Sequence, residues 1–219
     1  MKKLIFARIV IGIWFGIVSA HQPRLTFLSP PGWITQISNP EVSQAFYGIL
    51  SWQEDVYQIT SESGFFLYLS IVVPEMIGNR TDFTVDIIEG SSATYTRLDG
   101  KRYIRTGFYE KFAGDNYLQW PTFEKEVGPG TYTIRITNPN NLWKYSLAIG
   151  KIESFPLNET IHTYKVLPTL KTVFFGKPRY MMFRNIVWWA LIGAIIVIIL
   201  LIRFIIRLIR YLSTRKTWL

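Results

Sequence analysis

The sequence contains, near its C-terminal end, an uncharged apolar run from Ile186 to Ile202 that Arg203 closes. As an α-helix rising ~1.5 Å per residue, this run is about 25 Å long, close to the ~30 Å hydrocarbon core of a bilayer. A helix that is apolar on every face has to be surrounded by protein or by lipid. We therefore predict a transmembrane helix over residues 185–208.

The N-terminal end has the organisation of a secretory signal peptide. A basic start from Lys2 to Arg8 precedes an apolar stretch over 9–18, and small side chains lead up to a cleavage point after Ala20. Cleavage of residues 1–20 leaves His21 as the mature N-terminus. The alternative is an uncleaved anchor, for which the apolar stretch is short.

These two segments together predict one topology. The N-terminal segment starts export and the C-terminal helix stops it, so the chain crosses the cytoplasmic membrane once. The residues from 21 to about 183 then lie outside, and a basic tail over 209–219 lies inside. The lipid bilayer is thus the first expected partner.

Three arginines extend the C-terminal helix as a basic stripe. Arg203, Arg207 and Arg210 are spaced by four and three residues, which places them on one helix face. We expect this face at the inner membrane surface, against anionic lipid; ordinary positive-inside flanking is the alternative explanation. The outer flank, with Lys177 and Arg184, is basic as well, so the predicted orientation rests mainly on the signal peptide.

The formal net charge of +9 belongs to the targeting and anchoring segments. The signal segment is basic, and so is the chain from Arg184 onward. Residues 21–183 are formally neutral, because they contain as many acidic as basic residues. The basic charge is therefore no indication of nucleic-acid binding, and we expect no nucleic-acid partner.

The exported segment is long enough for one domain and contains no cysteine. Residues 21–155 can bury a single core. Without disulfides, packing alone has to hold this fold in an oxidising compartment, and thiolate chemistry is excluded. We expect residues 156–184 to form a stalk or connector, with a short helix over 157–166 that Pro168 ends or kinks.

The periodicity of the exported domain is that of β-strands. Residues 83–87 alternate apolar and polar side chains, whereas residues 65–73 are nearly continuous in apolar character, as expected of a central strand. Turn residues separate the predicted strands, which cover 33–37, 44–49, 56–60, 65–73, 83–87, 94–98, 131–136 and 145–149. About eight short strands predict a mainly β domain, an antiparallel β-sandwich or jelly roll.

Four motifs follow one another along these strands. They are Asp55-Val-Tyr-Gln-Ile, Asp82-Phe-Thr-Val-Asp-Ile, Gly128-Pro-Gly-Thr-Tyr-Thr-Ile-Arg-Ile and Tyr145-Ser-Leu-Ala-Ile-Gly. Their order, over about residues 42–150, resembles the bacterial pre-peptidase C-terminal (PPC) domains, small β-sandwiches appended to secreted proteases. The resemblance implies a noncatalytic module for binding, targeting or stability.

The whole layout resembles a second group as well. The stretch Asn39-Pro-Glu-Val-Ser-Gln-Ala-Phe-Tyr-Gly is similar to sequences in exported, single-span prokaryotic proteins of unassigned activity. This likeness implies an anchored, extracytoplasmic protein and supplies no activity.

His21 is the first candidate functional residue. A mature N-terminal histidine joins a free α-amine to an imidazole, and the amine and Nδ1 can together chelate Cu(II). A histidine brace needs a second imidazole, and the one other histidine is His162. The alternative is an ordinary frayed terminus, with His162 at the surface or at a helix cap. We expect no other cofactor.

The second candidate is the aromatic-rich segment 106–123, whose glycines and Pro121 interrupt regular structure. If exposed, its rings could stack on sugar rings or form a protein contact. If buried, they would close one end of the sandwich. The candidate binding residues are Phe108, Tyr109, Phe112, Tyr117, Trp120 and Phe123.

The sequence contains no nucleophile elbow, HExxH motif or phosphate-binding glycine loop. We therefore assign no catalytic residue and favour a noncatalytic module over an enzyme. The predicted function is a membrane-anchored β-sandwich that binds an unidentified protein or glycan, or serves in assembly, outside the cytoplasmic membrane. The alternative is a copper-binding or copper-dependent redox protein that uses His21. The sequons at Asn79 and Asn158 matter only in a glycosylating pathway.

Overall fold

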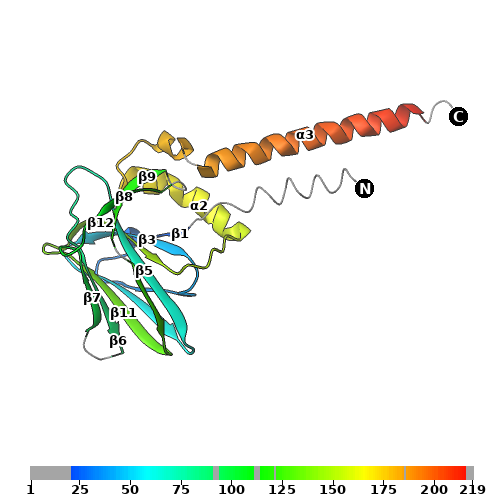
Figure 1. Cartoon of the computed structure of the whole chain (residues 1–219). Coiled ribbons are helices and arrows are strands. Elements are labelled where there is room, and N and C mark those ends of the chain that lie inside the picture. Colours follow the sequence, from blue (N-terminus) through cyan, green and yellow to red (C-terminus); the bar gives the residue numbers. More distant parts are fainter. Residues whose placement is uncertain (1–20, 91–93, 111–113, 121, 185, 216–219) are drawn as a thin grey trace.

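The computed structural model describes residues 21–90, 94–110, 114–120, 122–184 and 186–215. The predicted signal peptide, residues 1–20, lies outside this range, as does the end of the predicted tail, residues 216–219. In the described chain two β-sheets pack face to face, a helical layer covers one of them, and a long helix projects from the assembly (Figure 1).

Sheet A has seven strands, in the order β1-β3-β12-β5-β9-β8, with β10 paired to β5 as well. β9 and β10 occupy different parts of β5, because β10 pairs with residues 65–69 and β9 with residues 72–74. The strands are β1 (Gln22–Leu25), β3 (Gln44–Ser51), β5 (Phe65–Pro74), β8 (Thr106–Glu110), β9 (Asp115–Gln119), β10 (Phe123–Val127) and β12 (Leu142–Ile149).

Sheet B has five strands, in the order β2-β4-β11-β6-β7. Its strands are β2 (Ile34–Gln36), β4 (Asp55–Ser61), β6 (Thr84–Glu89), β7 (Thr94–Asp99) and β11 (Gly130–Thr137). Most pairings are antiparallel, but the edge strands β1 and β2 run parallel to β3 and β4. The predicted mainly β sandwich is confirmed, with mixed rather than purely antiparallel sheets.

Each predicted strand is present, with its ends shifted by a few residues. The strands β1, β8, β9 and β10 were not predicted. β8 is exposed along nearly its whole length, and β10 (FEKEV) has three exposed central residues. Such strands lack an alternating apolar face, so their pairing with β9 and β5 defines them, rather than their own periodicity.

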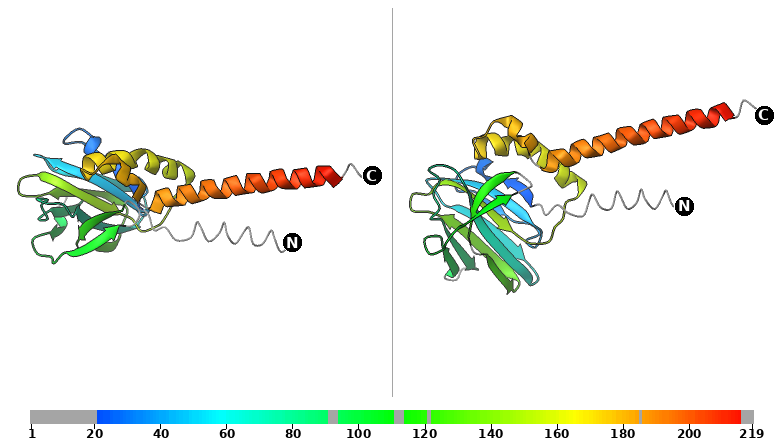
Figure 2. Two further views of the ribbon diagram at one scale, coloured as in Figure 1. Left: turned by 90° about the horizontal axis from the view of Figure 1, so that it is seen from above. Right: turned by 45° about the horizontal axis from the view of Figure 1, so that its top comes forward.

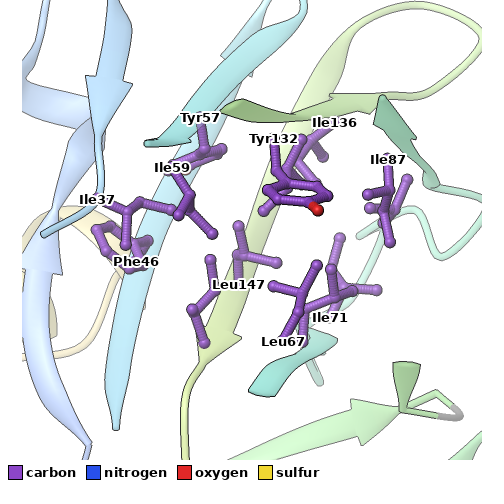
Figure 3. Packing of buried hydrophobic residues seen from close by; sticks show 14 of the residues in the cluster. Ile37, Phe46, Tyr57, Ile59, Leu67, Ile71, Ile87, Tyr132, Ile136 and Leu147 are labelled. Carbon is purple, nitrogen blue, oxygen red and sulfur yellow. The ribbon is translucent and has the colours of Figure 1, made fainter. Parts of the chain in front are cut away.

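The main core lies between the inner faces of the two sheets (Figure 3). On β11, Tyr132, Ile134 and Ile136 are at most 1% exposed, which is the period expected of a strand with one buried face. Leu67 and Leu147 of sheet A face them and are fully buried. Burial of each such side chain contributes about 1.5–3 kcal/mol.

Tyr145 in this core depends on a glycine in the neighbouring strand. Its cross-strand partner is Gly48, and a Cβ at that position would collide with the Tyr145 ring. The ring also packs at 5.6 Å, between centroids, on Phe83 of the loop before β6. The missing side chain at Gly48 therefore creates the space that Tyr145 fills.

The outer face of sheet A is covered by a helical layer. The layer consists of α2 (Leu157–Thr169), the π-helical turn η2 (Leu170–Phe174) and the 3₁₀ turn η3 (Arg179–Arg184). Its buried side chains pack on Ala45, Tyr47 and Tyr117 of the sheet, and they are Leu167, Leu170, Phe174, Phe175 and Met182. The segment expected as a stalk is thus packed against the sandwich.

Pro168 does not end α2. The helix continues to Thr169 and then changes to the π-helical hydrogen-bond pattern of η2. Pro168 has no amide hydrogen for an α-helical hydrogen bond, and a local change of helix type is a common response to such a gap.

The projecting helix is α3 (Ile186–Arg215). Within the described chain it is the one helix long and apolar enough to cross a membrane, over Leu191–Tyr211, and none of that stretch is buried by protein. In Figures 1 and 2 it leaves the molecule on the side where β1 lies. The exposed Arg203, Arg207 and Arg210 lie toward its C-terminal end.

We expect Gly48→Ala to lower the free energy of unfolding by about 1–3 kcal/mol, because the new methyl group displaces the Tyr145 ring. Gly107→Ala in β8 is the matched control, since nothing lies within 4 Å of a Cβ built there. Urea unfolding of the detergent-solubilised full chain measures both. Equal stability of the two variants would contradict this account of Gly48.

Candidate functional site

The aromatic-rich segment forms a hairpin and its continuation, not a loop. β8 and β9 pair with Phe108 opposite Tyr117. Phe108 and Tyr109 are 40% and 54% exposed, whereas Tyr117 and Trp120 are 2% and 4% exposed. Phe123 is half-buried at the start of β10, and Phe112 lies outside the described residues.

The two buried aromatics face opposite sides of sheet A. Tyr117 packs under the helical layer, with its ring 5.7 Å from that of Phe175. Trp120 belongs to the core between the sheets, 6.4 Å from the ring of Phe83. The segment therefore does not form one binding surface, and the exposed part is limited to Phe108 and Tyr109 within the described chain.

The two histidines lie in different surroundings. The Nδ1 of His21 is 2.5 Å from the hydroxyl oxygen of Ser43, and burial lowers the pKa of this imidazole, against the nearby charge of Glu153. His162 lies on α2 and lines a cleft of about 760 Å³ where Arg24 pairs with Glu159 at 2.8 Å. No group of three or more metal-binding side chains occurs in the described part of the chain. The nitrogen that copper chelation requires is hydrogen-bonded to Ser43.

A buried ion cluster joins sheet A to the helical layer. Asp115, at the start of β9, has a fully buried side chain that forms ion pairs with Lys171 and, at 2.7 Å, with Lys177. The Lys171 side chain is 1% exposed, and its ammonium nitrogen lies 5.3 Å from the centre of the Phe175 ring. Burial lowers the pKa of Lys171, and the Asp115 carboxylate opposes that change. No local sequence pattern indicates this cluster, because its members are far apart along the chain.

A pocket of about 370 Å³ lies where β3 ends and β4 begins. Trp33, which is 64% exposed, forms part of its wall, together with Gln53 of the β3–β4 connection and Asp55, the first residue of β4. Val173 of η2 contributes from the helical layer. An aromatic wall beside a carboxylate and an amide is a combination that can hold a polar ligand with an apolar face.

The polar wall of this pocket is fixed from inside the core. Tyr145 donates a hydrogen bond to Asp55 (2.6 Å), and the Tyr57 and Tyr145 hydroxyls lie 2.8 Å apart. The Tyr57 hydroxyl is also 3.1 Å from the Thr26 hydroxyl, which donates to the Tyr47 carbonyl. No local sequence pattern indicates this series of hydrogen bonds, because Asp55 and Tyr145 are separated by 90 residues.

Burial raises the pKa of the Asp55 carboxyl, and the hydrogen bond that Tyr145 donates to it opposes this change.

Asp55 makes the stability of the fold depend on pH in a defined direction. Because the pKa of Asp55 is raised in the folded state, its stabilising contribution is complete below the unfolded pKa and is lost as the pH rises through the folded pKa. We expect wild type to lose stability relative to Asp55→Asn as the pH rises from the unfolded pKa of Asp55 through its raised folded pKa, by about 1.4 kcal/mol per unit of raised pKa. Thermal or urea unfolding of both proteins across this range measures the difference. A stability of wild type, relative to Asp55→Asn, that stays constant or rises with pH would contradict it.

The ion cluster should matter far more than a surface pair. We expect Lys171→Met to lower the free energy of unfolding by about 3 kcal/mol, because Asp115 stays buried with a single, half-exposed cation. Lys151→Met is the matched control, since Lys151 and Glu124 form an ion pair of 2.7 Å at the surface. The control should lose less than about 1 kcal/mol. Equal losses would show that burial of Asp115 has no such consequence.

No family model matches the chain, and no curated protein matches it. Among solved structures, the chain is similar to the pre-peptidase C-terminal domain of a collagenase from Bacillus anthracis, with 15% identity and a TM-score of 0.35, over 55% of this chain and 97% of that one. It is also similar to a β-glucosidase from Paenibacillus barengoltzii, with 9% identity and a TM-score of 0.27, over 58% of this chain and 13% of the enzyme. The structural comparison thus returns the PPC domain that the sequence motifs resemble.

Proposed function

We propose that this protein is a noncatalytic binding module, anchored by α3 in the cytoplasmic membrane, with the β-sandwich outside. The observation that carries the proposal is the division of the molecule into an apolar helix and a preformed pocket. α3 projects on the side where β1 lies. The pocket is lined by the segment that follows β1, by Ser51 at the end of β3 and by Val173 of η2.

The pocket has the features of a binding site that exists before its ligand arrives. Tyr145 donates a hydrogen bond to Asp55, and the Tyr145 ring fills the space beside Gly48. The Asp55 side chain is therefore already ordered before a ligand binds. Trp33 supplies a broad apolar surface at the opening. A glycan or a protein side chain with hydroxyl or amide groups suits these partners.

Nearby apolar side chains extend the surface around this pocket. Trp52 is 75% exposed directly before Gln53, and its amide donates to the carbonyl of Asn141 in the β11–β12 turn. Trp143, which follows that turn, is 42% exposed. Exposed tryptophans at one end of a small domain are typical of an interaction surface.

The proposed orientation is tested by cysteine labelling, since the chain has no cysteine of its own. We expect a membrane-impermeant maleimide to modify Trp52→Cys in intact cells, and to modify Ser213→Cys, near the end of α3, after lysis alone. The reverse pattern, or labelling of both sites in intact cells, would contradict the proposed topology.

Ligand contact at the pocket is tested by photo-crosslinking of the full chain in its own membranes. p-Benzoylphenylalanine replaces Trp33 at the pocket, Tyr109 on β8, or the exposed Thr60 on β4 as a control. We expect an adduct at Trp33 that Thr60 does not give. The Tyr109 variant tests the exposed part of the aromatic segment separately. An absence of adducts at both Trp33 and Tyr109 would contradict the binding role.

A further inference from the structure

The segment that joins the helical layer to α3 carries large aromatic side chains that are about half exposed or more. In η3, Met182 is 9% exposed and packs into the layer, whereas Tyr180 and Phe183 are 63% and 47% exposed. Trp189, in the first turns of α3, is 65% exposed. Large exposed rings next to an apolar helix are the pattern found where membrane proteins meet the headgroup region.

The depth of these rings relative to α3 is fixed by packing. The Trp188 ring lies 4.7 Å from the ring of Phe183 and 5.2 Å from that of Tyr164 on α2. α3 begins at Ile186, where the uncharged apolar run also begins, and η3 ends at Arg184. η3 therefore lies next to the start of the apolar helix, where the roughly 5–8 Å headgroup layer begins if α3 spans the bilayer.

The charge of this segment suits anionic headgroups. After Glu159 the sequence contains no acidic residue. Lys171 and Lys177 are paired with Asp115, but Arg179 and Arg184 are exposed at the two ends of η3 and have no ion pair within the described chain. These two arginines flank Tyr180 and Phe183, so cationic and aromatic groups share one short turn.

We propose that Arg179, Tyr180, Phe183, Arg184 and Trp189 form a contact surface for the anionic headgroups of the outer leaflet. The sandwich is then seated on the membrane through its helical layer, instead of being held away from it. This inference rests on the proposed function, because it requires α3 to span the bilayer. The positive-inside rule does not account for basic residues on the outer side, and the proposal assigns Arg179 and Arg184 to headgroup contact.

The absence of cysteine allows the depth of single sites to be measured in the full chain. Nitroxide labels are placed on Tyr180→Cys, on Ile198→Cys in mid-span and on Thr60→Cys in the sandwich, and the protein is inserted in nanodiscs that contain phosphatidylglycerol. Collision with oxygen and with a water-soluble nickel complex reports the depth of each label. We expect Ile198 in the hydrocarbon core, Tyr180 at headgroup depth and Thr60 in water.

The possible failures are distinguishable. If Ile198 is at core depth and Tyr180 is as water-accessible as Thr60, the contact surface is wrong and the membrane anchor stands. If Ile198 is in water, the proposed anchor is wrong, and this inference fails with it.

Lipid preference tests the arginines separately. A fluorophore on Tyr180→Cys should be quenched two- to threefold more by nitroxide-labelled phosphatidylglycerol than by equally labelled phosphatidylcholine. Arg179→Gln with Arg184→Gln should remove this preference, whereas the control pair Lys101→Gln with Arg102→Gln, on the sandwich, should leave it unchanged. Equal quenching by the two lipids in the parent protein would overturn the assignment to anionic headgroups.

Discussion

The buried contact of Asp115 with Lys171 and Lys177 is the interaction on which the arrangement of this molecule depends. A carboxylate with no exposed surface is costly unless a cation stays beside it, so the helical layer cannot leave sheet A without exposing or orphaning Asp115. The apolar contacts of Leu167, Leu170 and Phe174 with the sheet act in the same direction. Because the layer leads directly into α3, this contact also sets where the sandwich lies relative to the apolar helix.

Sequence periodicity predicted the part of the fold in which one face of a strand is buried. β11 alternates cleanly in burial, and residues 83–87 alternate in residue type, and both strands are predicted from that pattern. β8 and β10 could not be, since exposed strands have no apolar face and exist through their partners. The aromatic segment shows the same limit in another form. Composition indicated many rings there, but only the pairing of β8 with β9 decides that Tyr117 is covered and that Tyr109 is not.

The candidate site was less predictable than the fold, because it is made of contacts between distant residues. Asp55 and Tyr145 meet across 90 residues, and Asp115 and Lys171 across 56. Local patterns carry no information on such pairs. The connector was expected as a stalk for a related reason: its apolar residues are spaced for a helix, and nothing in the sequence states what that helix covers. In the structure these apolar residues pack on sheet A, so the connector forms a third layer of the domain.

The core hydrogen bonds hold the pocket in place, and the buried ion pairs hold the helical layer on sheet A. The sandwich and the helical layer therefore form one rigid module next to α3. The central claim, that residues 157–184 are packed and not a flexible stalk, is tested most directly by pulsed electron paramagnetic resonance. Spin labels on Thr60→Cys in β4 and Lys165→Cys in α2 report the distance between sheet B and the helical layer in the membrane-inserted chain. The account predicts one narrow distance distribution, which broadens in Lys171→Met. A broad distribution in the parent protein would contradict it.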